Sequence, residues 1–203
     1  MANLIFYDAT HTYTVDGEEI PSVSELTRFI SREVYQDVTQ FRLDAAADRG
    51  TRVHKAAEAL DKFGEVEVDD EAAPYLQAYV KFRKEHNPDW EKIEWPLCYK
   101  KLYAGTIDRY GTMDGRHVIV DLKTTASIDR RHKILYTAAQ NLYRIAAAET
   151  VPVDALYILQ LVKDGSYKLI ELPIDDELPR ACLALHEALK PAKRRKKGEP
   201  KNG

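Results

Sequence analysis

Apolar positions along the chain recur with two different spacings, which separate predicted strands from predicted helices. Short runs of alternating character predict strands at residues 4–8, 11–15, 90–101, 154–162 and 166–174. Apolar spacings of three and four residues predict helices at about residues 22–32, 38–47, 50–63, 71–85, 134–149 and 176–190. This order of elements predicts an α/β fold, in which a mixed central β-sheet is flanked by helices and preceded by an N-terminal strand pair and helices.

Residues 103–125 predict a β-hairpin that carries acidic side chains. Asp114-Gly115 suits the positive φ angles of a tight type I′ turn, and the apolar run 118–120 forms the returning arm. Asp108 lies on the first arm and Asp121 on the second, so pairing about the turn can bring the two carboxylates toward one another. Lys123 shares a face with Asp121 because the two residues are two positions apart.

This hairpin could carry metal chemistry, because its second arm runs from apolar residues directly into charged ones and so emerges from the core into a cleft. Two carboxylates beside one ammonium group can hold a hard divalent cation, while the lysine orients a water molecule or stabilises charge on a phosphate. The alternative is a solvated hairpin with cross-strand ion pairs, and the hairpin alone favours neither interpretation.

Three further polar side chains are candidates near this cleft. His54 and Glu58 lie four residues apart on one predicted helix face, and either could supply metal or phosphate contacts toward the hairpin. Glu94 lies on the strand that leads into the hairpin and is a possible supporting acid. A lone helical histidine is more often a surface residue or one with satisfied hydrogen bonds, so His54 alone does not predict a metal ligand.

The helix after the hairpin offers candidate contacts to DNA. Tyr136, Gln140 and Tyr143 can share one helix face. A basic loop predicted at residues 129–133 places Arg130, Arg131 and Lys133 at the entry to that helix, where they could line a DNA groove. The alternative is that both tyrosines are core aromatics and the glutamine bonds to a neighbouring helix.

Composition narrows the class of protein. The 203 residues suit one domain, 1–190, followed by a basic tail, 191–203, that is predicted to be disordered. A net charge of −3 does not by itself indicate a nucleic-acid-binding protein. Only two cysteines occur, which argues against a disulfide scaffold, a zinc knuckle or a four-cysteine iron–sulfur cluster. With neither a membrane-length apolar run nor a signal pattern, we expect a cytoplasmic protein with no membrane contact.

The order of four short motifs resembles that of one nuclease family. Gly-Thr-Arg-Val-His at 50–54 is followed by Gly-Thr-Ile-Asp at 105–108, Val-Asp-Leu-Lys-Thr-Thr at 120–125 and Ala-Ala-Gln-Asn-Leu-Tyr at 138–143. This series resembles the RecB-type branch of the PD-(D/E)XK nuclease superfamily up to about Ala147. The phrase at 11–23 is similar to the start of phage-encoded members. The family's Gln-x-x-x-Tyr motif is one residue shorter here.

The resemblance implies a restriction-endonuclease-like core and a role for each matching residue. It implies His54, Asp108 and Asp121 as ligands of Mg²⁺ or Mn²⁺, with the Leu122 carbonyl as a helper. Lys123 is implied as the catalytic base or water-orienting group, and Gln140 joins the catalytic set. The implied activity is a metal-dependent DNA exonuclease in phage or bacterial recombination or repair. A single-strand-binding or annealing protein is the partner that such an enzyme would work with.

Two other functions remain open on the sequence. A metal-dependent endonuclease would share the same chemistry but would need base-reading elements. A catalytically inactive DNA-binding module would share the fold, although retention of all four matched residues, His54, Asp108, Asp121 and Lys123, favours an enzyme.

Overall fold

The computed structural model describes residues 3–190 except 8–9 and 11. The predicted tail 191–203, together with Asp8 and His11 of the predicted strands, lies outside the described residues. The helices are α1 (Val23–Leu26), α2 (Arg28–Tyr35), α3 (Gln40–Phe63), α4 (Ala73–His86), α5 (Arg130–Ala147) and α6 (Glu177–Leu189). The strands are β1 (Leu4–Tyr7), β2 (Thr12–Val15), β3 (Glu18–Ile20), β4 (Asp89–Tyr99), β5 (Tyr103–Met113), β6 (Arg116–Lys123), β7 (Ala155–Leu161) and β8 (Tyr167–Leu172). No described helix combines the length and the apolar character needed to cross a bilayer.

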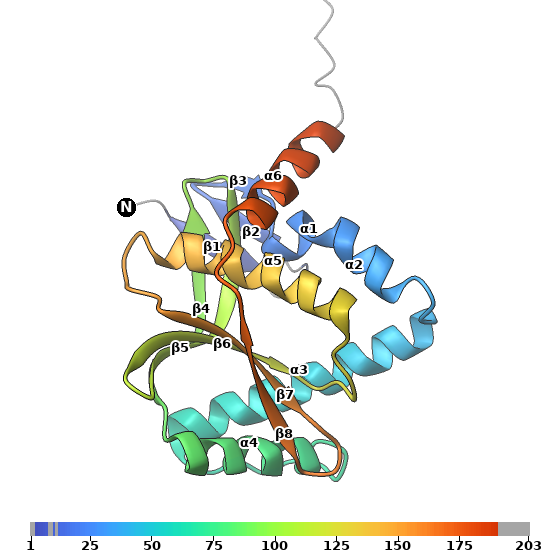
Figure 1. The fold of residues 1–203 in the computed structure, drawn as a ribbon, viewed down its shortest axis with the longest axis vertical. Coiled ribbons are helices and arrows are strands. Elements are labelled where there is room, and N and C mark those ends of the chain that lie inside the picture. Colours follow the sequence, from blue (N-terminus) through green and yellow to red (C-terminus); the bar gives the residue numbers. More distant parts are fainter. Residues whose placement is uncertain (1–2, 8–9, 11, 191–203) are drawn as a thin grey trace, which may run out of the picture.

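The larger sheet has the strand order β4-β5-β6-β7-β8, and helices pack on it (Figure 1). All neighbouring strands are antiparallel except β6 and β7, which are parallel and are connected through α5. Asp114 and Gly115 have φ angles of 51° and 75°, as the type I′ turn between β5 and β6 requires. The prediction of an α/β fold with a mixed sheet flanked by helices is therefore confirmed.

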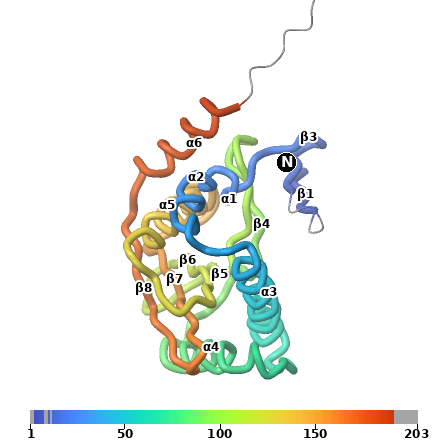
Figure 2. The backbone as a smooth tube through the Cα atoms, turned by 90° about the vertical axis from the view of Figure 1, so that its right-hand side faces the viewer, coloured from blue at the N-terminus to red at the C-terminus, as the bar shows by residue number. Residues whose placement is uncertain are grey.

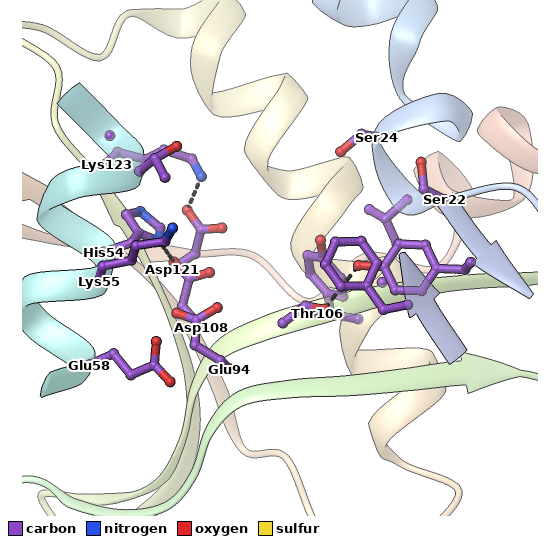
Figure 3. A pocket seen from close by; sticks show the side chains of 17 residues that line it. Ser22, Ser24, His54, Lys55, Glu58, Glu94, Thr106, Asp108, Asp121 and Lys123 are labelled. Carbon is purple, nitrogen blue, oxygen red and sulfur yellow. Dashed lines mark hydrogen bonds and ion pairs between the residues drawn. The ribbon is translucent and has the colours of Figure 1, made fainter. Parts of the chain in front are cut away.

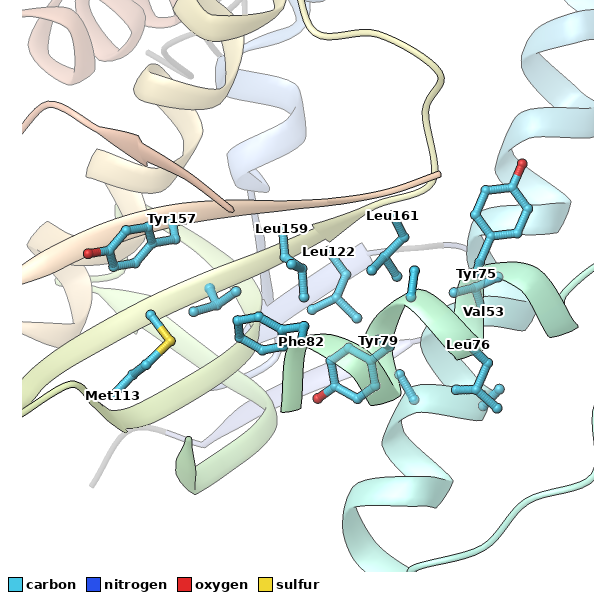
Figure 4. Packing of buried hydrophobic residues seen from close by; sticks show 14 of the residues in the cluster. Val53, Tyr75, Leu76, Tyr79, Phe82, Met113, Leu122, Tyr157, Leu159 and Leu161 are labelled. Carbon is cyan, nitrogen blue, oxygen red and sulfur yellow. The ribbon is translucent and has the colours of Figure 1, made fainter. Parts of the chain in front are cut away.

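Alternation along β6 divides the core between the two faces of this sheet. Val118, Val120 and Leu122 are fully buried against α3 and α4, in the cluster drawn in Figure 4. Ile119 points to the opposite face, where it joins a second buried cluster with residues of α1, α2 and α5. With Leu122 on the α3 side, its neighbours Asp121 and Lys123 lie toward α5, at the point where β6 leaves the core.

The N-terminal strands form a separate three-stranded antiparallel sheet rather than the predicted pair. Its third strand, Glu18–Ile20, is short and mostly polar, so its residue pattern gives little strand signal. Figure 2 shows this sheet beside β4 and away from α4. Tyr13 of β2 and Thr106 of β5 share a hydrogen bond of 2.9 Å, which ties the small sheet to the large one.

The prediction of two helices separated at residues 48–50 is wrong, because α3 runs unbroken for 24 residues. A glycine inside a helix costs about 1 kcal/mol relative to alanine, which is less than the packing of a buried helix face contributes. Val53, Ala56 and Ala57 supply that packing. Asp48 and Arg52 also form an ion pair of 3.0 Å across the predicted break.

Two other helix boundaries differ from the sequence prediction. The helix predicted at about 22–32 is two helices, α1 and α2, which meet at Thr27. The predicted basic loop 129–133 is the first turn of α5, because the Asp129 carboxylate accepts a hydrogen bond of 3.0 Å from the backbone N–H of His132 and caps the helix.

Substitution of Gly50 tests whether this position inside α3 requires a glycine. A Cβ atom at residue 50 would meet only Thr124 Oγ1, at 3.8 Å. We expect Gly50→Ala to raise the free energy of unfolding by about 0.5–1 kcal/mol, because alanine costs less backbone entropy in a helix. Urea denaturation measures this. In contrast, Gly111→Ala should destabilise the protein by about 1–3 kcal/mol, because its Cβ would overlap the Asp89 carbonyl oxygen. Equal effects of the two substitutions would contradict this account.

Candidate metal-dependent active site

The candidate site begins where β5 and β6 stop pairing. Their ladder runs from Met113 and Arg116 to Arg109 and Val120, and the strands separate after that pair. Beyond the separation, the Leu122 N–H donates a hydrogen bond of 2.8 Å to Asp108 Oδ2. The Leu122 carbonyl accepts one of 2.9 Å from His54 Nε2 on α3. The side chains of Asp108 and His54 therefore form the hydrogen bonds with the Leu122 N–H and carbonyl that a neighbouring strand would otherwise form.

Glu94 of β4 lies opposite Asp108 across the sheet. The paired residues on either side, Ile93 with Arg109 and Trp95 with Ile107, fix this position. Glu94 has a φ angle of 48°, which is uncommon for a residue other than glycine and interrupts the extended backbone of β4. Because of this local irregularity, the Glu94 side chain on the edge strand β4 points into the cavity that Asp108 also lines.

His54, Glu94 and Asp108 form a group that could hold a metal ion. One ligand atom from each lies within 4.8 Å of the other two (Figure 3). His54 Nε2 donates to the Leu122 carbonyl, so in a neutral imidazole Nδ1 would offer the lone pair that a metal ion requires; this atom lies 3.5 Å from Asp108 Oδ2. Two carboxylates and one imidazole are a donor set that suits Mn²⁺ or Mg²⁺, with the nitrogen favouring Mn²⁺.

Asp121 and Lys123 form an ion pair beside this group, as their spacing on one strand face predicted. Lys123 Nζ lies 2.5 Å from Asp121 Oδ2 and 5.6 Å from the centre of the Tyr136 ring. Burial raises the pKa of the Asp121 carboxyl, with a contribution from Asp108, although Lys123 opposes this. Burial alone would lower the pKa of Lys123, but the two carboxylates outweigh it and the pKa is raised.

A buried arginine supports the two acids on β4 and β5. Arg109 has no exposed side-chain surface and forms an ion pair of 2.7 Å with Asp61, which is 1% exposed. Its Nη1 donates to Glu94 Oε1 at 3.2 Å and to the Asp108 carbonyl at 2.7 Å. Even so, burial and the facing charge of Asp108 raise the pKa of Glu94 to about 7. Without a cation, Glu94 therefore resists ionisation.

The candidate residues line neighbouring cavities. A cavity of about 430 Å³ is lined by the proposed metal-binding group, the Asp121–Lys123 pair, Glu58 and Tyr143. Glu58 also forms an ion pair of 2.5 Å with Lys62. A smaller cavity of about 210 Å³ meets the first at Asp121, Lys123 and Tyr143 and is lined by Tyr136 and Gln140. The two cavities together hold most of the residues that the sequence suggested.

The candidates on α5 differ in exposure. Arg130, Arg131 and Lys133 are exposed on the first turn of α5 and do not line the larger cavity. Tyr136 is 6% and Gln140 is 1% exposed, so both belong largely to the interior. Within the described residues, Gln140 Oε1 has no hydrogen-bond partner. Tyr136 thus belongs to the core cluster and also lines the smaller cavity, and its contact to DNA stays a prediction.

Two residues matter more than the sequence indicated. Glu94 was expected only as a supporting acid, yet it belongs to the compact ligand group, whereas Asp121 is paired with Lys123. Arg109 gave no sequence signal beyond following Asp108 directly. Cross-strand register places Glu94 opposite Asp108, because pairing is continuous from Tyr99 with Tyr103 to Ile93 with Arg109. The turn that sets this register was not recognised in the sequence, where the strand was predicted to run to residue 101.

Comparisons with known proteins do not identify a family. No family model and no curated protein matches this chain. A solved structure described as "Crystal structure of SSO0001" is similar at a TM-score of 0.43 and 14% sequence identity, covering 90% of this chain and 82% of that one. A likeness at that level does not show what activity this chain has.

The raised pKa of Glu94 predicts a pH-dependent loss of stability. Between its ordinary value of 4.5 and its folded value of about 7, the folded state keeps a proton that the unfolded state releases. The contribution of Glu94 to the free energy of unfolding should therefore fall as pH rises from about 4.5 to about 7. Urea denaturation in EDTA across this range measures it, as the difference between the wild type and Glu94→Gln. A difference that stays constant with pH would refute the assignment.

Proposed function

We propose that this protein is a divalent-metal-dependent deoxyribonuclease with a restriction-endonuclease-like fold of the RecB type. The observation that carries the proposal is that the candidate side chains come together where β5 and β6 separate. There, the ligand atoms of His54, Glu94 and Asp108 lie within 4.8 Å, next to the ion pair of Asp121 and Lys123. Carboxylates beside a lysine at the end of a strand suit cleavage of a phosphodiester bond, where both the attacking water and the developing negative charge need stabilisation.

The proposed mechanism assigns one task to each group of residues. His54, Glu94 and Asp108 would hold the cation, which supplies Lewis acidity and lowers the pKa of water. Asp121 is available to accept a hydrogen bond from the attacking water and fixes the position of Lys123. Because the pKa of Lys123 is raised, its ammonium stays protonated at neutral pH, which favours a role in orienting water or stabilising the phosphate over that of a base.

The DNA substrate and the exonuclease activity complete the proposal. The exposed basic residues Arg130, Arg131 and Lys133 on α5 are available to contact phosphates beyond the cleft. Gln140 would act on the Asp121–Lys123 pair from the smaller cavity, which it lines together with both residues. An annealing or single-strand-binding partner would receive the single strand that digestion leaves.

The test of the activity is cleavage of end-labelled linear DNA and of closed circular DNA with Mn²⁺, Mg²⁺ or EDTA. We expect metal-dependent loss of linear DNA only, and a decrease of at least about a hundredfold in Lys123→Ala, since removing one group that stabilises transition-state charge costs about 10²–10³ in rate. Lys81→Ala, an exposed residue of α4, is the matched control. Cut circles would indicate an endonuclease instead, and DNA binding without cleavage would indicate an inactive module.

Metal binding gives a second prediction that does not depend on turnover. His54→Ala should weaken binding of Mn²⁺ at least about tenfold and weaken binding of Mg²⁺ less, because imidazole prefers the softer cation. Isothermal titration of both ions measures this. His186→Ala on α6, outside the lining of the larger cavity, is the control. Unchanged Mn²⁺ affinity in His54→Ala would remove this residue from the proposed ligand set.

A further inference from the structure

A groove lies between α6 and the two short helices α1 and α2. Helix α6 packs against α1, and both lie at the opposite end of the molecule from α4 (Figure 1). The groove has a volume of about 300 Å³. None of the residues that line it lines either cavity of the candidate site. It is therefore a surface separate from the proposed metal-binding group.

Buried and exposed apolar side chains line this groove together. Leu26 of α1 is buried and Leu185 of α6 is half-buried. Phe29 of α2 is 56% exposed and Leu189 of α6 is 68% exposed. A single exposed apolar side chain is ordinary on a protein surface. Two large ones, on the two helices that line one groove, indicate an interaction site.

The charged side chains of the groove are mostly cationic. Arg28, Arg32 and Lys190 line it together with one carboxylate, that of Glu25. Glu25 forms an ion pair of 3.4 Å with Arg28, and Lys190 pairs with Glu187. Within the part of the chain that the structure describes, the guanidinium of Arg32 has no hydrogen-bond or ion-pair partner. The groove therefore offers positive charge on a protein whose net charge is −3.

We propose that this groove binds a short acidic segment of another protein, which inserts a large apolar side chain between Phe29 and Leu189. Apolar side chains buried at the centre of an interface supply most of its affinity. Charges at the rim favour an acidic segment over a basic one and speed its association. A groove of about 300 Å³ is at the lower end of the range of about 300–1,000 Å³ for ligand sites, which suits the side chains of a segment. This inference does not rest on the proposed nuclease function.

Three other occupants complement the groove less well. DNA would be held through its phosphates, to which the four apolar side chains offer no hydrogen-bond donor. Residues 191–203 of the chain itself are basic and contain no large aliphatic or aromatic residue, so neither their charge nor their side chains match the groove. A second copy in a two-fold dimer would place two grooves of like charge against each other. An acidic segment with an apolar side chain satisfies both the charge and the apolar surface.

Selection from a random library of short peptides tests the chemistry of the partner. The library is bound to the immobilised full chain, and peptides that also bind Phe29→Ala are removed. We expect the remaining peptides to combine acidic residues with a large aliphatic or aromatic one. In fluorescence anisotropy they should bind Phe29→Ala at least about tenfold more weakly, as for truncation of a central interface residue. Arg32→Glu should also weaken binding, and less so at high salt.

The matched controls are Phe63→Ala, at the end of α3 and 77% exposed, and Lys84→Glu on α4, since neither residue lines the groove. If no peptide remains, or if those that remain are not acidic, the proposal is overturned. Single-stranded DNA that binds the wild type but not Phe29→Ala or Arg32→Glu, with no such peptide, would indicate a nucleic-acid surface instead. A dimer that Phe29→Ala dissociates in sedimentation would indicate a second copy as the occupant. Unchanged thermal unfolding of Phe29→Ala would show that its loss of binding does not arise from misfolding.

Discussion

The separation of β5 from β6 is the constraint on which the candidate site depends. Buried backbone groups need hydrogen-bond partners. After the strands separate, the N–H and carbonyl of Leu122 bond to the side chains of Asp108 and His54. Arg49 of α3 donates a hydrogen bond of 3.1 Å to the carbonyl of Thr124, two residues further along. Helix α3 therefore takes the place of a missing strand along this edge of β6. The same contacts that complete the sheet bring polar side chains of α3 and β5 into one cavity.

This arrangement has an electrostatic cost that the rest of the fold offsets. Glu94 and Asp108 face one another on neighbouring strands, and like charges so placed are destabilising. Arg109, which is itself buried, forms ion pairs with both Glu94 and Asp61 and so offsets part of this cost. The compensation is incomplete, since the pKa of Glu94 remains at about 7. Such a residual imbalance is what a bound divalent cation would remove, which links the stability of the site to the proposed activity.

Much of the central sheet could be predicted because its information is local. Alternation along 118–123 and the Asp114-Gly115 turn specify the hairpin, and the two-residue spacing places Lys123 beside Asp121. The position of Glu94 was not predicted, because it depends on the turn between β4 and β5 at Lys100 and Lys101 and on the positive φ angle of Glu94 itself. Nor was the continuity of α3, since the residues that bury its face lie in α4 and the sheet, distant in sequence. The features that the sequence did not predict are those that depend on tertiary contacts.

The two sheets divide the properties of the cavity between them. The central sheet and α3 supply its charged side chains, which are fixed by ion pairs and by hydrogen bonds to backbone. The N-terminal sheet supplies a ring stack joined to the central sheet through the hydrogen bond of Tyr13 with Thr106. The charged side chains and the ring stack of the cavity therefore belong to different elements of the fold, and the described contacts that fix the acids do not pass through the N-terminal sheet.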